Sequence, residues 1–407
     1  MAGASDGSCE GDMPTSKQGA EGALGTVGRT MTDATPGQPR RKPRVAVVFG
    51  GRSTEHAVSC VSAGSVLAAI DRETYDVVPV GISHEGRWVL AADEPERLAI
   101  TGDKLPEVES TGAAVVLAGD PTHKGLTVHE PGQVPEELGE VDVVLPLLHG
   151  PYGEDGTLQG LLELAGVPYV GSGVFASAAS MDKGHMKTLL RGAGLPVGPY
   201  AVVTPRAWDT DPAAVRETVA GLGFPCFVKP ARAGSSVGIS KVHDASEVDD
   251  AIELARSHDP RVVVEAMLEG REIECGVLEG LDGGAPEASV PGEIVVGGDH
   301  EFYDFAAKYL PDEGTDLVVP ADLTDDQVAE VQSLAVQAFE ALACEGLARV
   351  DFFLTASGFV VNEVNTMPGF TPVSMFPLMW KESGLDYPAL VDRLVQTALA
   401  RNPGLLR

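Results

Sequence analysis

The C-terminal part of the chain reads Arg349-Val350-Asp351-Phe352-Phe353-Leu354, then Thr355-Ala356-Ser357-Gly358, then Phe359-Val360-Val361-Asn362-Glu363-Val364-Asn365. Two strand-like runs flank a short loop that ends in glycine, a pattern typical of a β-hairpin. A three-residue loop over 356–358 would pair Thr355 with Phe359. The same register predicts that Asp351 lies opposite Glu363 and Arg349 opposite Asn365.

These pairs would bring polar side chains to one face of the hairpin. Opposed residues have Cβ atoms roughly 4.5–5.5 Å apart, and residues two apart on a strand share a face. Asp351, Glu363 and Asn365 would thus offer two carboxylates and an amide oxygen beside Arg349. Such oxygen ligands suit Mg²⁺, with water and substrate phosphates completing its coordination. The alternative is a surface hairpin with ordinary charge pairs, although opposed carboxylates repel unless a positive charge lies between them.

Length, charge and cysteine content restrict the class of protein. The chain has 407 residues, more than a single hydrophobic core usually holds, and so predicts two or three domains. Its net charge of −31 disfavours nucleic acid or an anionic membrane as a partner. No apolar run is long enough to span a membrane. The five cysteines are scattered and show no zinc spacing, so we expect reduced thiols in a cytoplasmic protein.

The first half of the chain predicts a tail and an α/β domain. Residues 1–43 are rich in small residues and proline and indicate a flexible tail. Residues 44–172 predict an open, mostly parallel sheet, whose ligands usually lie at the carboxyl ends of the strands. Gly50-Gly51 and His149-Gly150 lie at such ends. The expected elements are strands at Val45–Phe49, Tyr75–Ile82, Ala113–Leu117, Leu126–His129, Val141–Leu148 and Val167–Val170, a helix capped by Ser53 and ending near Ile70, and a helix at Gly156–Ala165.

The rest of the chain predicts two further subdomains, over 173–264 and 265–407. The loop Ala233–Gly238 carries glycine and hydroxyl groups that could fold over phosphates, with Lys229 just upstream as a point charge. It is not a P-loop, because the chain contains no Gly-Lys-Ser or Gly-Lys-Thr. The expected elements are helices at Phe175–Arg191, Ser246–Ser257 and Asp325–Cys344, the last capped by Thr324 and Gln327, and strands at Phe227–Lys229, Ile239–Val242 and Arg261–Glu265.

Five motifs, in this order, resemble those of D-alanine–D-alanine ligases of the ATP-grasp superfamily, and the resemblance covers about residues 44–400. The motifs are Gly50-Gly51-Arg52-Ser53-Thr54-Glu55-His56, His149-Gly150-Pro151-Tyr152-Gly153-Glu154-Asp155-Gly156, Met181-Asp182-Lys183, Gly234-Ser235-Ser236-Val237-Gly238 and Asn362-Glu363-Val364-Asn365-Thr366-Met367-Pro368-Gly369. Each motif is weak alone, but together they are specific. The resemblance implies an α/β protein whose open, mostly parallel N-terminal sheet precedes a two-part α+β ATP-grasp fold, and it implies a homodimer.

The resemblance also implies a reaction. ATP phosphorylates the carboxylate of one D-alanine, and the amine of a second D-alanine attacks the acyl phosphate. The products are ADP, phosphate and D-alanyl-D-alanine, which is used for peptidoglycan. Such phosphoryl transfer depends mainly on positioning and charge neutralisation. The implied cofactors are ATP and two Mg²⁺ or Mn²⁺ ions.

The family's functional residues match individual positions of this sequence. The matches to metal ligands are Asp351, Glu363 and Asn365. The matches to nucleotide contacts are Lys183, Lys229, Ser236, Glu265, Leu268, Glu272 and Lys308. The matches to contacts with the two D-alanine molecules are Glu55, His149, Tyr303, Ser374 and Met375. The matches to catalytic residues are Glu55, Ser235, Tyr309, Arg349 and Gly369.

Two departures and two alternatives accompany this interpretation. Ala266 stands where the family often has a lysine near the adenine, and Ala57 stands where many members carry a second glutamate. A related ligase could join D-alanine to D-lactate or D-serine, but the pair Lys308-Tyr309 argues against the lactate type. A non-catalytic nucleotide-binding regulator would be expected to have lost at least one of the residues matched to the metal and the transferring phosphate. All four are present: Arg349, Asp351, Glu363 and Asn365.

Overall fold

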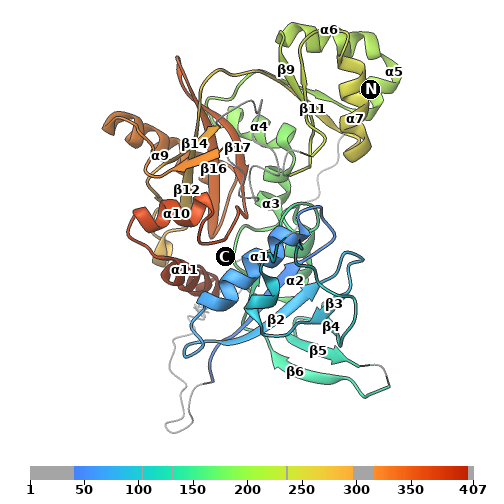
Figure 1. The fold of residues 1–407 in the computed structure, drawn as a ribbon, viewed down its shortest axis with the longest axis vertical. Helices are drawn as coiled ribbons and strands as arrows, with labels where there is room; N and C mark the ends of the chain where they lie inside the picture. Colours follow the sequence, from blue (N-terminus) through green and yellow to red (C-terminus); the bar gives the residue numbers. More distant parts are fainter. Residues whose placement is uncertain (1–40, 103, 131, 235–236, 297–314, 402–407) are drawn as a thin grey trace, which may run out of the picture. The chain divides into compact units, whose positions relative to one another are not determined.

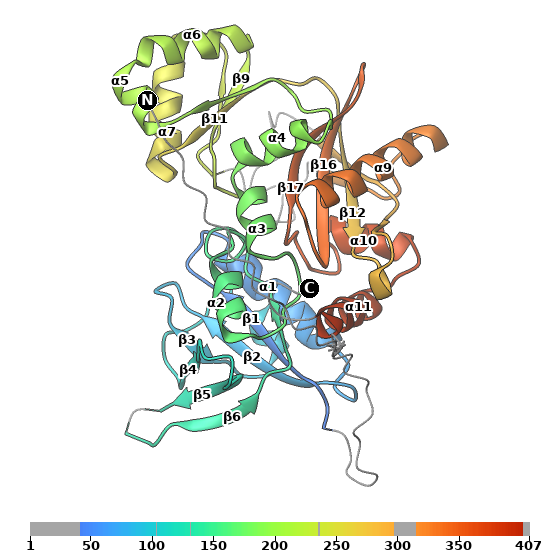
Figure 2. The ribbon, with the colours of Figure 1, turned by 180° about the vertical axis from the view of Figure 1, so that it is seen from behind.

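The computed structural model describes residues 41–102, 104–130, 132–234, 237–296 and 315–401, which form three β-sheets and the helices packed on them (Figures 1 and 2). The tail predicted over 1–43 lies almost entirely outside the described residues. Because the described chain mixes helices with these sheets, the predicted fold class is confirmed.

The first sheet has seven strands in the order β6-β5-β4-β3-β2-β1-β7. Its parallel part is β2-β1-β7, and the strands from β3 to β6 extend it in antiparallel pairing. The predicted strand Val167–Val170 is reduced to one bridge between Val144 and Tyr169. The strands are β1 (Arg44–Gly50), β2 (Asp76–Ile82), β3 (Trp88–Leu90), β4 (Ala114–Leu117), β5 (Gly125–His129), β6 (Glu136–Glu140) and β7 (Val143–Pro146).

Helices from both ends of the chain cover the first sheet. The helix α1 (His56–Ala69) packs on β1, and the C-terminal α11 (Tyr387–Ala400) contacts α1 and β7 (Figure 2). These elements share one core. On the other face lies α2 (Thr157–Ala165). The predicted Ser53 cap is wrong: α1 begins at His56, and the Ser53 hydroxyl donates to the His149 carbonyl at 2.6 Å.

The second sheet is antiparallel, in the order β10-β9-β11-β8. Three helices pack on one of its faces and bury Val219 and Ile252 with the strand side chains (Figure 1). The opposite face presents Lys229 and Glu265 to a cavity. The elements are β8 (Tyr200–Val203), α5 (Pro205–Thr210), α6 (Pro212–Leu222), β9 (Cys226–Pro230), β10 (Ser240–Val242), α7 (Val248–His258) and β11 (Val262–Ala266).

The third sheet is also antiparallel, in the order β15-β14-β12-β16-β17, with β13 paired to β12. Alternation along β12 and β16 buries Ile273 and Val350 in the core beneath α9 and turns Glu274 and Asp351 to the cavity. The capping box of Thr324 and Gln327 is present on α9. The elements are β12 (Arg271–Leu278), β13 (Glu287–Ala288), β14 (Gly292–Val296), β15 (Thr315–Val318), α9 (Asp325–Ala341), β16 (Leu347–Thr355), β17 (Gly358–Asn365) and α10 (Met375–Glu382).

The helix predicted over Phe175–Arg191 is in fact two helices, α3 (Val174–Met181) and α4 (Lys183–Gly192). Asp182 between them has an extended backbone, and its carboxylate accepts the amide N–H groups of Gly184 and His185, both at 3.1 Å. A side chain that caps a helix from this position favours a new helix start over a continuous one. The break sets Lys183 at the N-terminus of α4, facing the cavity.

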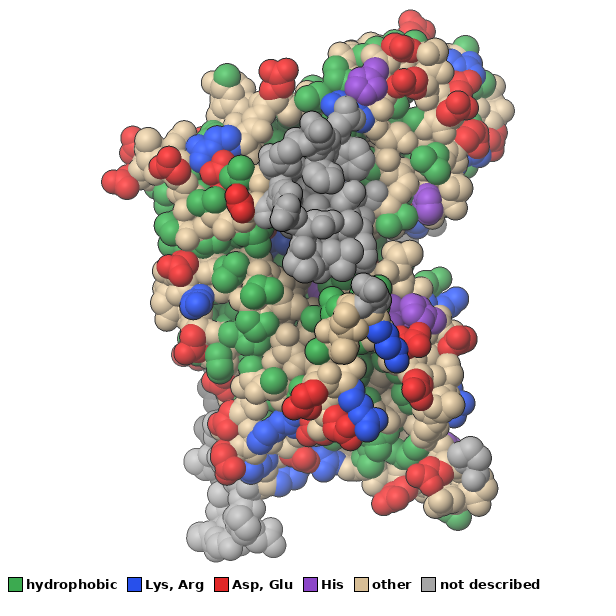
Figure 3. Space-filling view, in the orientation of Figure 1, with side chains coloured by type: hydrophobic (Ala, Val, Ile, Leu, Met, Phe, Trp, Pro, Cys, Tyr) green, Lys and Arg blue, Asp and Glu red, His purple; other side chains and the backbone are tan. Residues whose placement is uncertain are grey.

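The surface and the thiols agree with the composition. On the face drawn in Figure 3, acidic side chains are widely spread and the basic ones lie among them. Four cysteines, Cys60, Cys226, Cys275 and Cys344, are buried and free. Among the described residues, no helix combines the length and the apolar character needed to cross a membrane.

Candidate active site

The predicted hairpin over residues 349–365 is formed by β16 and β17, and its loop is shorter than predicted. Thr355 pairs with Gly358, so the three-residue loop prediction is wrong by one residue. A bulge at Asn362 then shifts the register back between Asp351 and Phe352. As a result, the predicted pairs of Asp351 with Glu363 and of Arg349 with Asn365 are present.

A cavity of about 850 Å³ lies beside this hairpin, between residues of the second and third sheets and the start of α1. All the predicted site residues that the structure describes line it: Glu55, His149, Lys183, Lys229, Glu265, Leu268, Glu272, Arg349, Asp351, Glu363, Asn365, Gly369, Ser374 and Met375. Five predicted residues lie outside the described ranges: Ser235, Ser236, Tyr303, Lys308 and Tyr309. The residues predicted from the sequence thus come from distant segments of the chain and line the same cavity.

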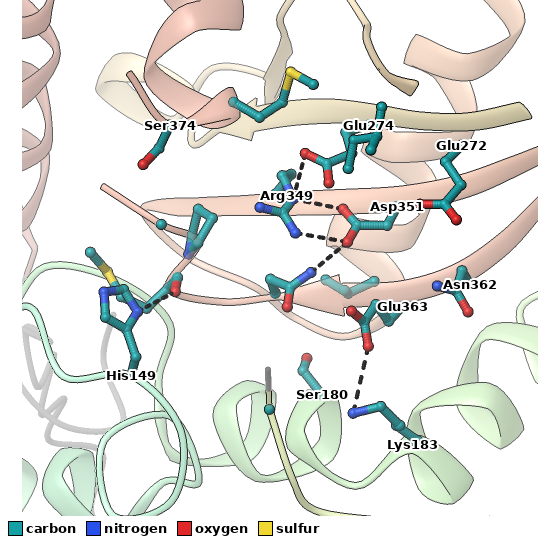
Figure 4. A pocket seen from close by; sticks show the side chains of 18 of the residues that line it. His149, Ser180, Lys183, Glu272, Glu274, Arg349, Asp351, Asn362, Glu363 and Ser374 are labelled. Atoms are coloured by element: carbon teal, nitrogen blue, oxygen red, sulfur yellow. Dashed lines mark hydrogen bonds and ion pairs between the residues drawn. The ribbon is translucent and has the colours of Figure 1, made fainter. Parts of the chain in front are cut away.

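Arg349 holds the acidic side of the cavity together (Figure 4). Its Nε donates to Asp351 Oδ1 at 2.7 Å and its Nη2 to Asp351 Oδ2 at 2.9 Å, while Nε also lies 3.0 Å from Glu274 Oε2. The Asn365 amide donates to Asp351 Oδ2 at 2.9 Å. Burial opposes the charge of Arg349, but Asp351 and Glu274 outweigh it and raise the pKa of the guanidinium further above its usual value.

Lysines of the second sheet and of α4 supply positive charge opposite these carboxylates. Lys183 Nζ lies 3.5 Å from Glu363 and donates to the Ala233 carbonyl at 2.9 Å. Glu265 lies between Lys229, at 2.7 Å, and Lys187, at 3.2 Å. Lys187 is a site residue that the sequence analysis missed, since a lone lysine on a predicted helix carries no signal. Burial lowers its pKa, and Glu265 opposes that shift.

The other end of the cavity is formed by Glu55 and His149. Glu55 is 7% exposed and immediately precedes α1. His149 is also buried, which lowers its pKa, and its ring nitrogens contact the Met367 carbonyl at 3.1 Å and the Ser62 hydroxyl at 3.3 Å. A Cβ atom on Gly234 would lie 2.5 Å from a Glu55 carboxylate oxygen, so any larger residue there would displace that carboxylate.

Glu154 is a second residue that received no predicted role, although it stands in the quoted motif 149–156. Its carboxylate accepts the Gly150 N–H at 2.7 Å and the Met367 N–H at 3.1 Å. Burial, with the neighbouring charge of Glu55, raises the pKa of Glu154 to about 8. The residue thus ties the loop after β7 to the segment after β17.

Ser374 and Met375 lie where α10 begins. Ser374 is the N-cap residue, and its hydroxyl contacts the Thr371 hydroxyl at 2.8 Å and accepts the Thr371 N–H at 3.2 Å. The N-terminus of a helix favours a carboxylate through its free N–H groups and its dipole. A substrate carboxylate could therefore bind here, some way from the metal-ligand candidates.

The donor set of the cavity can be tested against a divalent cation. Within the described ranges, no group of three or more His, Cys, Asp or Glu side chains is arranged to hold a metal ion. The predicted ligands are instead two carboxylates, Asp351 and Glu363, and the amide of Asn365. Mg²⁺ typically takes one or two carboxylates and completes its shell with water and phosphate oxygens. The residues present thus fit Mg²⁺ bound together with a nucleotide.

Comparison with known sequences points to one family. Two family models match the chain, D-ala D-ala ligase N-terminus over residues 44–172 and D-ala D-ala ligase C-terminus over residues 189–396. The D-alanine–D-alanine ligase of Streptomyces griseus is 62% identical over 380 residues, which cover 91% of this chain and 96% of that protein. The D-alanine–D-alanine ligase of Kineococcus radiotolerans is 60% identical over 373 residues, 89% of this chain and 98% of that protein.

Solved structures give the same result. VanG D-Ala:D-Ser ligase from Enterococcus faecalis is similar with a TM-score of 0.76 at 38% identity, covering 88% of this chain and 100% of that one. The D-alanine–D-alanine ligase from Coxiella burnetii is similar with a TM-score of 0.74 at 37% identity, covering 89% of this chain and 95% of that one.

Proposed function

Because the chain belongs to the D-alanine–D-alanine ligase family, we infer that it joins two D-alanine molecules into D-alanyl-D-alanine at the expense of ATP. The reaction releases ADP and phosphate through a D-alanyl phosphate, and the dipeptide serves peptidoglycan synthesis. The observation that carries the inference is the match at 62% identity over nearly the full length of a D-alanine–D-alanine ligase. The fold likeness and the cavity that the described predicted residues line support it.

We assign the nucleotide to the side of the cavity between the second and third sheets. Glu265, Leu268 and Glu272 would contact the adenine and ribose, and Lys183 and Lys229 would neutralise the phosphates. Lys229 already pairs with the Glu265 carboxylate, so its ammonium group would be shared between that carboxylate and the phosphate. Two predicted nucleotide contacts, Ser236 and Lys308, belong to the same proposal but lie outside the described residues.

Asp351, Glu363 and Asn365 would hold the divalent cations, proposed as two Mg²⁺ or Mn²⁺ ions. When bound, such ions neutralise the developing charge on the phosphates and align them for transfer. Arg349 would face the transferring phosphate and the acyl oxygen from the neighbouring row of the sheet. Gly369 would offer its backbone N–H to the oxyanion. The chain's own contribution is thus fixed charge placed around the reacting phosphate.

The two D-alanine molecules would share the remaining space, each bound by its own set of residues. Glu55 would bind the ammonium group of the first, beside the neutral, buried His149. Ser374 and the N-terminus of α10 would bind the carboxylate of the second, with Met375 as an apolar wall. The predicted partners Ser235, Tyr303 and Tyr309 would complete the enclosure, which protects the acyl phosphate from water.

The specificity for the second substrate needs an experiment, since VanG is a D-Ala:D-Ser ligase. We would measure phosphate release from ATP with D-alanine alone, with L-alanine, and with D-alanine plus D-serine or D-lactate, and identify the products by mass spectrometry. D-alanine alone should suffice. A requirement for D-serine or D-lactate would overturn the acceptor assignment, and no phosphate release in any mixture would favour the non-catalytic regulator.

The family resemblance also supports proposals about organisation. We propose a homodimer in the cytoplasm, with an N-terminal domain over 44–172, a central ATP-grasp subdomain over 173–264 and a C-terminal catalytic subdomain over 265–407. Sedimentation equilibrium would measure the mass in solution. A monomer at micromolar concentration would contradict the dimer.

A further inference from the structure

Three carboxylates lie in one row across neighbouring strands of the third sheet. Glu274 on β12 pairs with Asp351 on β16, which pairs with Glu363 on β17. All three line the cavity, and the Glu274 side chain is only 5% exposed. Burying negative charge in this way is costly unless cations compensate it. The roles proposed above use Asp351 and Glu363 but give none to Glu274.

Arg349 is the cation that links Glu274 to this row. It lies two residues before Asp351 and so projects to the same face. Its two bonds to Asp351 use both carboxylate oxygens, at 2.7 and 2.9 Å, while its contact to Glu274 is 3.0 Å long and uses Nε (Figure 4). The guanidinium is therefore shared between a proposed metal ligand and a carboxylate with no proposed ligand role.

This sharing creates a conflict once a divalent cation is bound. A cation on Asp351 needs a carboxylate oxygen that Arg349 now occupies, and the two positive groups repel each other at close range. If Arg349 had Asp351 as its sole anionic partner, each cation would have to displace the other. Glu274 offers a second anion on the side of Arg349 away from Glu363, because β12 and β17 flank β16 on opposite sides.

We propose that Glu274 is a positioning residue that holds the Arg349 guanidinium in the cavity while Asp351 ligates the divalent cation. The inference rests on the proposed function, which makes Asp351 a metal ligand and places Arg349 at the transferring phosphate. Arg349 and the divalent cation would otherwise compete for the Asp351 carboxylate, and Glu274 relieves that competition. Without its charge, Arg349 stays on Asp351 and weakens cation binding.

The test uses Glu274→Gln, which keeps the size of the side chain and removes its charge. The probe is Mn²⁺, titrated by electron paramagnetic resonance into the full-length protein saturated with ADP. The variant should bind Mn²⁺ about tenfold more weakly, the change expected when a charged partner of a buried group is lost. In the ligase assay, the Mg²⁺ concentration for half-maximal rate should rise and kcat should fall.

A matched control is available on the same sheet. Glu293 on β14 binds Arg271 through two bonds, at 2.7 and 2.6 Å, and its side chain is 12% exposed. It does not belong to the residues that line the cavity. Glu293→Gln removes a comparable ion pair and should lower the melting temperature without changing Mn²⁺ binding.

The outcomes distinguish the inference from its premise. If Glu274→Gln binds Mn²⁺ as tightly as the wild type and Asp351→Asn does not bind it, the proposed role of Glu274 is overturned and the metal assignment stands. Unchanged Mn²⁺ binding in Asp351→Asn would overturn the metal assignment and the inference with it. If Glu274→Gln does not fold, Glu274→Asp keeps the charge on a shorter side chain. Its Mn²⁺ affinity should then fall below the wild-type value, because the shorter side chain lies farther from Arg349, and a wild-type affinity would overturn the proposal.

Discussion

Asp351 and Glu363 face each other because a one-residue bulge at Asn362 corrects the register that the hairpin loop sets. Without the bulge, the pairing of Thr355 with Gly358 would continue and bring Asn362 opposite Asp351. Glu363 would then turn to the other face of the sheet, since side chains alternate along a strand. The proposed metal site thus depends on a local irregularity, and such bulges commonly lie next to active sites, where they redirect a side chain.

Lys187 fixes this bulge, and its removal is our first prediction. Its Nζ donates to the Asn362 carbonyl at 2.7 Å and pairs with Glu265 at 3.2 Å, and the side chain is 5% exposed. Lys187→Met leaves both acceptors without that donor, a loss of about 1–3 kcal/mol. We expect a lower melting temperature and a higher KM for ATP, measured by thermal denaturation and steady-state kinetics. Lys187→Arg keeps the charge and should recover part of both, and a variant with wild-type KM would contradict a link between the bulge and the nucleotide.

Glu363→Gln tests the carboxylate on the bulged strand. The change removes one charge from the proposed metal site and from the contact with Lys183, which is 3.5 Å long. Losing a charge-assisted bond costs roughly 1.5–3 kcal/mol, or about one to two powers of ten in rate. We expect kcat to fall by that factor at saturating ATP and Mg²⁺, with the melting temperature little changed. Full activity under those conditions would contradict the assignment of Glu363 as a metal ligand.

Ser374→Ala tests the proposed acceptor end of the cavity. The hydroxyl lies at the N-terminus of α10 and contacts Thr371 at 2.8 Å. Its loss should raise the KM for the second D-alanine by about tenfold, the effect of one hydrogen bond to a carboxylate, and leave the KM for ATP unchanged. Ser383 lies at the other end of the same helix, so Ser383→Ala is the control. Equal effects of the two variants would mean that Ser374 supports only the helix.

The sequence predicted the polar face of the hairpin because strand alternation and cross-strand pairing depend on spacing alone. The pairs of Asp351 with Glu363 and of Arg349 with Asn365 are present, but through two compensating departures. The loop is one residue shorter than expected, and the bulge adds one residue back. Neither the shorter loop nor the bulge changes the hydrophobic periodicity of the sequence. The predicted pairs are therefore present in the structure although the predicted loop length is wrong.

Other features depended on contacts between distant segments and could not be predicted. The break at Asp182 needs a capping side chain inside an apparently continuous helical pattern. The strands β12 and β14 and the helix α10 were not anticipated, although they complete the third sheet and the acceptor end. Lys187, Glu154 and Glu274 became candidates only when the fold set them beside predicted residues. The family resemblance, by contrast, supplied all the described residues of the predicted set, and all of them line the cavity.

Glu154 gives a prediction about pH. Its folded-state pKa of about 8 lies above the usual value of 4.5, because of burial and then the charge of Glu55, opposed by the Gly150 and Met367 N–H groups and by Lys183. Between these values the folded chain keeps a proton that the unfolded chain has released. Folding stability contributed by this group should therefore fall as pH rises from about 5 towards 8, and level off above that. Glu154→Gln cannot titrate and should lack this slope.

The measurement compares melting temperatures of the wild type and Glu154→Gln across that pH range. The glutamine also loses one of the two backbone bonds, which shifts the whole curve by a constant and does not change its slope. The variant's melting temperature should thus rise relative to the wild type as pH increases. D-alanine should reduce the difference, because its ammonium group beside Glu55 would favour the ionised form of Glu154. If the pH curves of the wild type and Glu154→Gln are parallel, both with D-alanine and without it, Glu154 ionises as an ordinary carboxyl. Its two backbone bonds would then outweigh its burial.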